Sequence, residues 1–176
     1  MHSIEKSMTS KTSKSKRASG ATKSPVGSVN ISLIQNIPEL IHELGFDEMA
    51  IFNALQLDIK QFKNPNNKLS YDDLGCLLAY CVDYCQYPNF GLLVGQRIEL
   101  ESMAILGMLM KNAPTLGVAM QMGEKHMQLN DRGAVASLIP IDASHVAMTF
   151  TLINGATVAS NHIIDAATVL HFKLLK

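Results

Sequence analysis

Three cysteines within ten residues are the first group in this sequence whose side chains could do chemistry together. Cys76, Cys81 and Cys85 could bind a metal ion as thiolates. Their spacings, four and then three intervening residues, differ from the paired C-x2-C spacing of zinc sites, and no second cluster supplies the remaining ligands. Leucines recur around Cys81 and Cys85 at helical spacing, which favours small side chains in a hydrophobic core. We therefore predict no metal site.

Other catalytic patterns are missing from the sequence. The six histidines are scattered, and none forms an H-x-x-x-H or H-E-x-x-H pair. The chain contains no G-x-S-x-G nucleophile turn, no G-x-x-x-x-G-K-[ST] phosphate loop and no G-x-G-x-x-G dinucleotide motif. The sequence thus favours a binding or regulatory protein over an enzyme, and it implies no cofactor.

Methionine is the unusual residue type, because six of the ten methionines fall between positions 103 and 127. Flexible thioether side chains fill irregular spaces and can line a pocket that adapts to a ligand. This pattern makes Met103, Met110 and Met120 candidates for the wall of a ligand site. An ordinary core stripe at helical spacing is the alternative, and the sequence leaves both open.

Arg97 stands just before the methionine-rich segment, between two predicted helices. A guanidinium group in an apolar neighbourhood can hold a ligand carboxylate through two parallel hydrogen bonds. Arg97 is therefore a candidate anchor for a small carboxylate. A structural ion pair with Glu99 or Glu101 is the alternative interpretation.

Length and composition indicate one folded domain of about 100–150 residues plus a tail. The chain has 176 residues, 47% of them hydrophobic, and equal numbers of basic and acidic side chains, 15 of each. No uninterrupted apolar stretch approaches the roughly 18 residues that span a bilayer. An odd number of cysteines argues against a secreted disulfide scaffold and suits the cytoplasm.

The balanced charge conceals two unlike segments. Residues 1–29 carry six basic residues against one acid, together with eight serines and three threonines, which predicts a disordered basic tail. Residues 30–176 carry nine basic and fourteen acidic residues and form the predicted domain. A net negative domain is poorly suited to gripping nucleic-acid phosphates.

Helical signals dominate the first part of the domain. Helix N-caps are expected at five polar residues: Asn36, Asp47, Asp58, Ser70 and Thr115. The clearest helix follows Ser70, because apolar residues recur from Leu74 to Cys85 on one face. Further helices are expected near 91–97, 102–111 and 115–127.

The period then changes from helical to alternating. Residues 146–152 alternate between apolar and small or polar side chains, which predicts a half-buried strand, with 134–139 as its hairpin partner and 128–131 as a third strand. A turn at Asn154-Gly155 and an amphipathic helix through Ile163 and Leu174 follow. The fold class is therefore α+β: a multi-helix region, a small antiparallel β-meander and a C-terminal helix. So small a sheet leaves edges and a face uncovered, which suggests an incomplete domain.

Four segments in the same order give the sequence a family resemblance. They are Phe90-Gly91-Leu92-Leu93-Val94-Gly95-Gln96-Arg97, Leu106-Gly107-Met108-Leu109-Met110, Ala113-Pro114-Thr115-Leu116-Gly117 and Asn130-Asp131-Arg132-Gly133-Ala134. Together they resemble the N-terminal effector-binding domain of AraC-type transcription regulators, in the arabinose-binding-like branch. The resemblance covers about residues 32–176.

This resemblance implies a ligand-sensing and dimerising regulatory domain. The expected ligand is a small metabolite such as an amino acid or another carboxylate, and the expected assembly is a homodimer. Relatives bind DNA through a C-terminal domain with two helix-turn-helix units, and this chain has no such segment. Whether the chain is a fragment of a longer regulator or a truncated product stays open. The alternative function is a dimerisation module that binds neither ligand nor DNA.

Overall fold

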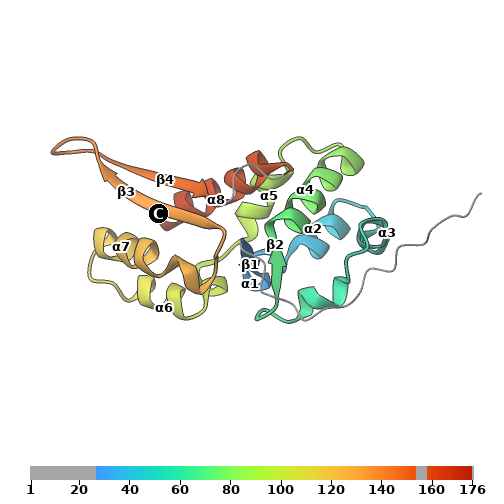
Figure 1. Cartoon of the computed structure of the whole chain (residues 1–176), viewed down its shortest axis with the longest axis horizontal. Coiled ribbons are helices and arrows are strands. Elements are labelled where there is room, and N and C mark those ends of the chain that lie inside the picture. Colours follow the sequence, from blue (N-terminus) through green and yellow to red (C-terminus); the bar gives the residue numbers. More distant parts are fainter. Residues whose placement is uncertain (1–26, 154–157, 176) are drawn as a thin grey trace, which may run out of the picture.

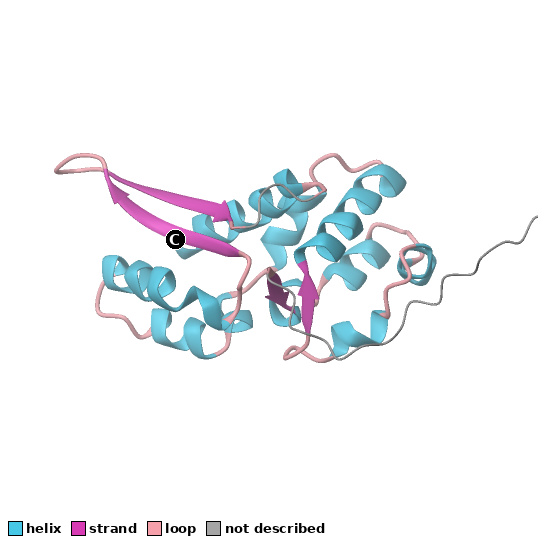
Figure 2. Cartoon of the chain, in the orientation of Figure 1, coloured by secondary structure: helices cyan, strands magenta, loops and turns pink. Residues whose placement is uncertain are grey.

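The computed structural model describes residues 27–153 and 158–175. Its elements follow the chain in this order: β1 (Ser28–Asn30), α1 (Ile31–Ile34), α2 (Ile37–Glu43), α3 (Glu48–Ala54), η1 (Ile59–Lys63), β2 (Lys68–Ser70), α4 (Tyr71–Cys85), α5 (Phe90–Arg97), η2 (Leu100–Met103), α6 (Ile105–Lys111), α7 (Leu116–His126), η3 (Met127–Leu129), β3 (Ala134–Pro140), β4 (Val146–Leu152) and α8 (Ser160–Leu174). The predicted α+β class is confirmed (Figure 2). The turn predicted at Asn154-Gly155 lies outside the described residues.

The elements form two groups joined by α8. Helices α1 to α5 gather with β1 and β2 at one end, whereas α6, α7 and the β3–β4 hairpin form the other end (Figure 1). Two hydrophobic clusters correspond to these groups: a large one centred on α2, α4 and α5, and a smaller one around α6 and α7. Helix α8 contributes Ile163 to the first cluster and Leu170 to the second. No helix in the described part of the chain is both long and apolar enough to cross a membrane.

Four of the five predicted N-caps are confirmed. Asp47 accepts a hydrogen bond from the Ala50 amide, and Asp58 and Ser70 accept equivalent bonds at the starts of η1 and α4. Thr115 accepts from the Val118 amide at 3.2 Å and begins α7. Each cap satisfies an amide that the first helical turn leaves without an intrahelical partner.

The fifth residue, Asn36, stands at the N-cap position of α2 as predicted, but the side-chain capping bond is absent. Its backbone is helical (φ −85°, ψ −1°), and its side chain makes no capping bond. The Asn36 amide instead donates to the Arg97 carbonyl at 3.1 Å. This bond satisfies a carbonyl at the end of α5, so Asn36 both starts α2 and connects it to α5.

Helix α4 is the centre of the larger cluster, as its periodicity predicts. Leu77, Leu78 and Cys81 are almost completely buried, and Cys85 is buried one turn further on, while Cys76 is exposed. Burial raises the pKa of Cys81, and that of Cys85 as well. The expectation that Cys81 and Cys85 act as core side chains is confirmed.

A small sheet near the start of the domain was not predicted. Strand β1 pairs antiparallel with β2, so that Val29 stands opposite Leu69. Ser28 and Val29 are buried in this sheet, which corrects the boundary of the predicted tail at these two residues. Residues 1–26 of that tail lie outside the described part.

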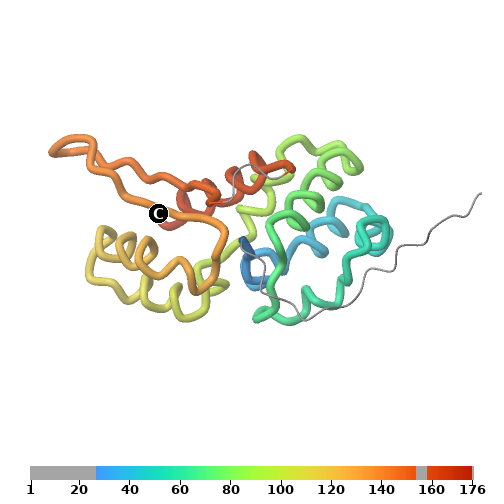
Figure 3. Tube along the Cα trace, viewed as in Figure 1, coloured from blue at the N-terminus to red at the C-terminus, as the bar shows by residue number. Residues whose placement is uncertain are grey.

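The predicted third strand at 128–131 is wrong. Residues Met127–Leu129 form the short helix η3, and only Asp131 makes an isolated antiparallel bridge, to Val29 of β1. Figure 3 shows that this bridge brings the beginning of the domain beside the entry into β3. The Asp131 bridge therefore connects the base of the β3–β4 hairpin to the group formed by α1 to α5, β1 and β2.

The hairpin itself matches the alternating pattern. Strands β3 and β4 pair antiparallel from Ala134 opposite Leu152 to Pro140 opposite Val146. On one face, Leu138 and Met148 pack against the smaller hydrophobic cluster. Val135 and Ile139 point to the other face and are exposed.

The single helix predicted for 102–111 is interrupted. Leu100–Met103 is the 3-10 helix η2, and α6 begins only at Ile105. Between them Ala104 has φ +50° and ψ −123°, a conformation that alanine rarely adopts. This break directs the Met103 side chain toward the smaller cluster, while α6 continues along the surface.

Helix α8 packs closely on α5 because Gly91 and Gly95 leave space for it. A Cβ atom at Gly95 would lie 2.6 Å from the Ala166 carbonyl oxygen and 2.8 Å from the Val169 Cβ. The Lys173 ammonium group then joins the C-terminal ends of both helices by donating to the Gln96 and Ile98 carbonyls at 3.0 and 2.7 Å. These contacts set the position of α8 above the space between the two clusters.

Candidate functional site

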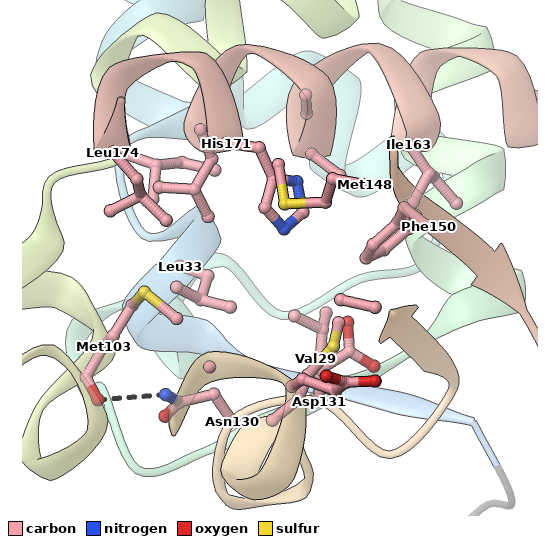
Figure 4. A pocket seen from close by; sticks show the side chains of 18 of the residues that line it. Val29, Leu33, Met103, Asn130, Asp131, Met148, Phe150, Ile163, His171 and Leu174 are labelled. Carbon is pink, nitrogen blue, oxygen red and sulfur yellow. Dashed lines mark hydrogen bonds between the residues drawn. The ribbon is translucent and has the colours of Figure 1, made fainter. Parts of the chain in front are cut away.

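A cavity of about 100 Å³ lies where the two groups of elements meet. Its walls come from β1 and α1 on one side, from α6, α7 and the hairpin on another, and from α8 above (Figure 4). A buried water needs roughly 10–15 Å³ of comparable volume. The cavity therefore has room for a ligand of several non-hydrogen atoms.

Methionine side chains form much of the wall. All three candidate methionines, Met103, Met110 and Met120, line the cavity, and Met127 and Met148 join them. Met108 does not, because it points outward from α6 with 66% of its surface exposed. The structure thus brings together the residues that sequence clustering suggested, with flexible thioethers around one space.

Arg97 is not among the residues that line this cavity. Its guanidinium group forms an ion pair with Glu43 at the end of α2 and a long hydrogen bond to the Leu93 carbonyl. The two acids expected as alternative partners are paired elsewhere, Glu99 with Lys173 and Glu101 with Lys111. The structure therefore separates Arg97 from the methionines and gives it a structural partner that the sequence did not indicate.

The most deeply buried charged group at the cavity is Asp131, which is 4% exposed. Its carboxylate accepts hydrogen bonds from the Tyr71 hydroxyl and from the amides of Gly133 and Ala134, the latter two at 2.8 and 3.1 Å. Burial raises the pKa of Asp131 although these bonds act in the opposite direction. Burial and the nearby carboxyl group likewise raise the pKa of Tyr71, so its hydroxyl stays protonated and donates.

Asn130 links the cavity floor to the break before α6. Its side-chain amide donates to the Met103 carbonyl at 2.9 Å, the bond drawn in Figure 4. Met103 immediately precedes Ala104, the residue with the unusual backbone conformation. One hydrogen bond therefore connects a cavity-lining side chain to the strained turn that positions both Met103 and α6.

His171 faces Asp131 from the opposite side of the cavity, on α8 (Figure 4). Burial lowers the pKa of His171, and a hydrogen bond to the Ala167 backbone opposes this shift only in part. The imidazole also lies 5.9 Å from the Phe150 ring, measured between centroids. At neutral pH this side chain is therefore an uncharged part of the wall.

The His171 environment predicts a specific loss of stability in weak acid. The unfolded chain binds a proton near pH 6.5, whereas the folded chain resists protonation until lower pH. Stability from this residue is therefore present above pH 6.5 and lost as the pH falls toward the folded pKa. We expect His171→Gln to show a smaller fall in melting temperature between pH 7.5 and pH 5, measured by thermal denaturation. A constant offset between the two curves would contradict the expectation.

Sequence reasoning missed the polar groups at this site. The sequence pattern assigns Asp131 to a strand, and nothing in it marks Tyr71, Asn130 or His171 as site residues. The two bonded residues Tyr71 and Asp131 are sixty positions apart, so no local pattern pairs them. The available signal was weak: an Asp two residues before Gly133 suggests an Asx-type turn, whose carboxylate then needs further donors when buried.

Metal binding finds no support in the described ranges, where no three His, Cys, Asp or Glu side chains gather as a metal site would require. Chemically, the arrangement is an apolar space with hydrogen-bonding groups at opposite ends. Such a space suits the reversible binding of a small molecule.

Comparison with known proteins identifies the family of this chain. The family model for the arabinose-binding domain of AraC transcription regulators, an N-terminal domain, matches residues 45–175. The ornithine utilization regulator of Pseudomonas aeruginosa is 28% identical over 101 residues, which is 57% of this chain and 30% of that regulator. The chain thus matches less than a third of the length of this relative. Because the family model covers about three quarters of the sequence, the chain belongs to the family of N-terminal arabinose-binding domains of AraC transcription regulators.

Proposed function

We propose that this chain senses a small metabolite, which binds in the cavity between the two groups of elements. The observation that carries the proposal is the convergence of five methionines and two opposed polar groups, Asp131 and His171, on one space. Ligand pockets typically combine such an apolar wall with a few placed polar groups. Met103, Met110 and Met120 are the proposed contact residues, whereas Arg97 lies outside the cavity lining.

Binding in this place would act on the relative position of the two groups. Ile34 and Leu74 line the cavity from the larger cluster, whereas Met110 and Leu138 line it from the smaller one. A ligand that touches both sets binds more tightly when they are close, and it therefore shifts the population toward that arrangement. We propose that a homodimer of such regulators in the cytoplasm passes this shift to a DNA-binding helix-turn-helix domain.

A metabolite screen by thermal denaturation tests the proposal. A ligand at one hundred times its Kd stabilises the folded state by about 2.7 kcal/mol. We expect at least one metabolite to raise the melting temperature of the unchanged chain. Ala136→Leu, which adds bulk to a buried residue lining the cavity, should abolish the rise.

Two control variants locate the effect. Val135→Leu adds bulk on the exposed face of the same strand and should leave the ligand-induced rise unchanged. Arg97→Ala removes the ion pair with Glu43 and should lower the melting temperature slightly without altering the ligand-induced rise. A rise that survives in Ala136→Leu, or that disappears in Arg97→Ala, would contradict binding in this cavity.

The alternative function, an assembly module without a ligand, is supported by exposed apolar side chains. Ile105 and Met108 on α6 and Ile139 and Ile141 at the hairpin are each at least half exposed. Large exposed apolar patches often mark interaction sites, and a patch on α6 or on the hairpin would serve assembly. A pure assembly module would change its melting temperature with protein concentration and with no metabolite.

A further inference from the structure

We propose that the ligand of this cavity carries a protonated amine, which binds against Asp131, on an apolar chain that the methionines surround. This inference rests on the proposed function and names the chemical class of the metabolite. It depends on the acceptor capacity of Asp131, on the charges around the cavity and on the group at the opposite end.

Asp131 has acceptor capacity to spare. A carboxylate offers about four lone-pair sites, and three are filled by the Tyr71 hydroxyl and the Gly133 and Ala134 amides. Two of these donors are backbone amides of the turn, the third is the Tyr71 hydroxyl at the start of α4, and none of them carries a positive charge. One acceptor position is therefore open to a donor on a ligand.

The charges around the cavity favour a cation. Two acids, Asp131 and Glu124, line it, and in the described ranges neither Lys nor Arg does. The ion pairs of the described residues involve other acids and leave Asp131 without a cationic partner. A buried carboxylate without a counter-ion is costly, and an ammonium group from a ligand would offset that cost. A ligand carboxylate would instead be repelled.

The opposite end of the cavity adds a second acceptor. The His171 ring donates one N–H to the Ala167 backbone, which leaves its other nitrogen with a lone pair in the uncharged form. His171 is therefore no competing cation for Asp131. Between the two ends lie Met103, Met148 and Leu33 (Figure 4), which suit methylene groups and disfavour a polyol.

Four probes of equal chain length test the amine class. Pentylamine, 1,5-diaminopentane, 1-pentanol and pentanoate are titrated at pH 7 into the whole chain, with the melting temperature and isothermal calorimetry as readouts. We expect the two amines to bind at least tenfold more tightly than the alcohol and pentanoate to have no effect. Equal or tighter binding of pentanoate or the alcohol would overturn the proposal.

Variants then locate the amine. Asp131→Asn keeps the oxygen that accepts from the two amides but removes the charge, and it should weaken amine binding at least tenfold. Asp142→Asn is the matched control, because Asp142 accepts from the Ser144 and His145 amides in a similar turn but is exposed at the hairpin tip. Unchanged amine binding in Asp131→Asn would overturn the proposal. If this variant does not fold, the comparison of probes in the unchanged chain decides.

Different experimental results would contradict this inference and the proposed function. A non-amine metabolite whose effect Ala136→Leu abolishes would overturn the amine class and leave the sensor function standing. A screen in which no compound stabilises the chain would overturn the sensor function itself.

Discussion

Replacing Gly95 with valine is expected to lower the free energy of unfolding by about 3 kcal/mol, a typical cost for forcing extra atoms into a packed interface. A Cβ atom at this position would lie 2.6 Å from the Ala166 carbonyl oxygen, and the backbone of α8 cannot yield without moving the whole helix. Urea denaturation followed by circular dichroism measures the effect.

Gly117 provides the control for this substitution. It lies on α7, is exposed, and a Cβ atom there would meet its nearest neighbour at 3.9 Å. Gly117→Ala should change stability by less than about 1 kcal/mol and in the stabilising direction, since alanine favours helix. Equal stability of Gly95→Val and Gly117→Ala would show that α8 does not pack on α5 as described. It would also remove the basis for placing His171 at the cavity.

Replacing Asp131 with alanine is expected to cost about 3 kcal/mol or more, because each buried donor left without a partner costs about 1–3 kcal/mol. The substitution leaves the Tyr71 hydroxyl and the Gly133 and Ala134 amides without their acceptor. The raised pKa of Asp131 shows that burial of its charge opposes folding, so part of the loss is recovered when the charge is removed. Equilibrium unfolding at pH 7 measures the difference.

Asp142→Ala is the comparison for Asp131→Ala. Its side chain accepts hydrogen bonds from the Ser144 and His145 amides, but in an exposed turn where water can replace it. We expect its cost to stay below about 1 kcal/mol, the usual range for surface positions. Equal losses in the two variants would show that Asp131 is not the buried junction between β1, α4 and the hairpin.

Local elements of this fold were predictable because their signals are short-range. The face of α4 from Leu74 to Cys85 follows from a 3.6-residue period, and the caps at Asp47 and Ser70 involve residues three positions apart. The alternation in 146–152 likewise specifies a half-buried strand. Each of these features depends on neighbours along the chain.

The junctions between elements were not predictable in the same way. Asn36 looks like a cap, but the Arg97 carbonyl, sixty-one residues away, binds its side chain. The bridge between Val29 and Asp131 replaces the strand expected at 128–131. The break at Ala104 contains no glycine that would predict a positive φ. The hydrogen bond from Asn130 to Met103 joins residues that are twenty-seven positions apart in the sequence.

The candidate site shows the same division. Clustering of methionines in the sequence identified three residues that line the cavity, because η2, α6 and α7 are adjacent and their buried faces meet. The polar groups could not be found this way, since Tyr71, Asp131 and His171 come from three separate parts of the chain. The ion pair of Arg97 could not be found this way either, because its partner Glu43 lies on a distant helix that local spacing does not reveal.

Methyl resonances of the methionines offer the most direct test that the cavity is the ligand site. The chain is labelled with 13C at the methionine methyl groups, and spectra are recorded with and without a stabilising compound. We predict that the signals of Met103, Met110 and Met120, which line the cavity, shift on binding, while those of the exposed Met49 and Met108 stay in place. Shifts confined to Met49 or Met108, with the cavity methionines unchanged, would contradict the account.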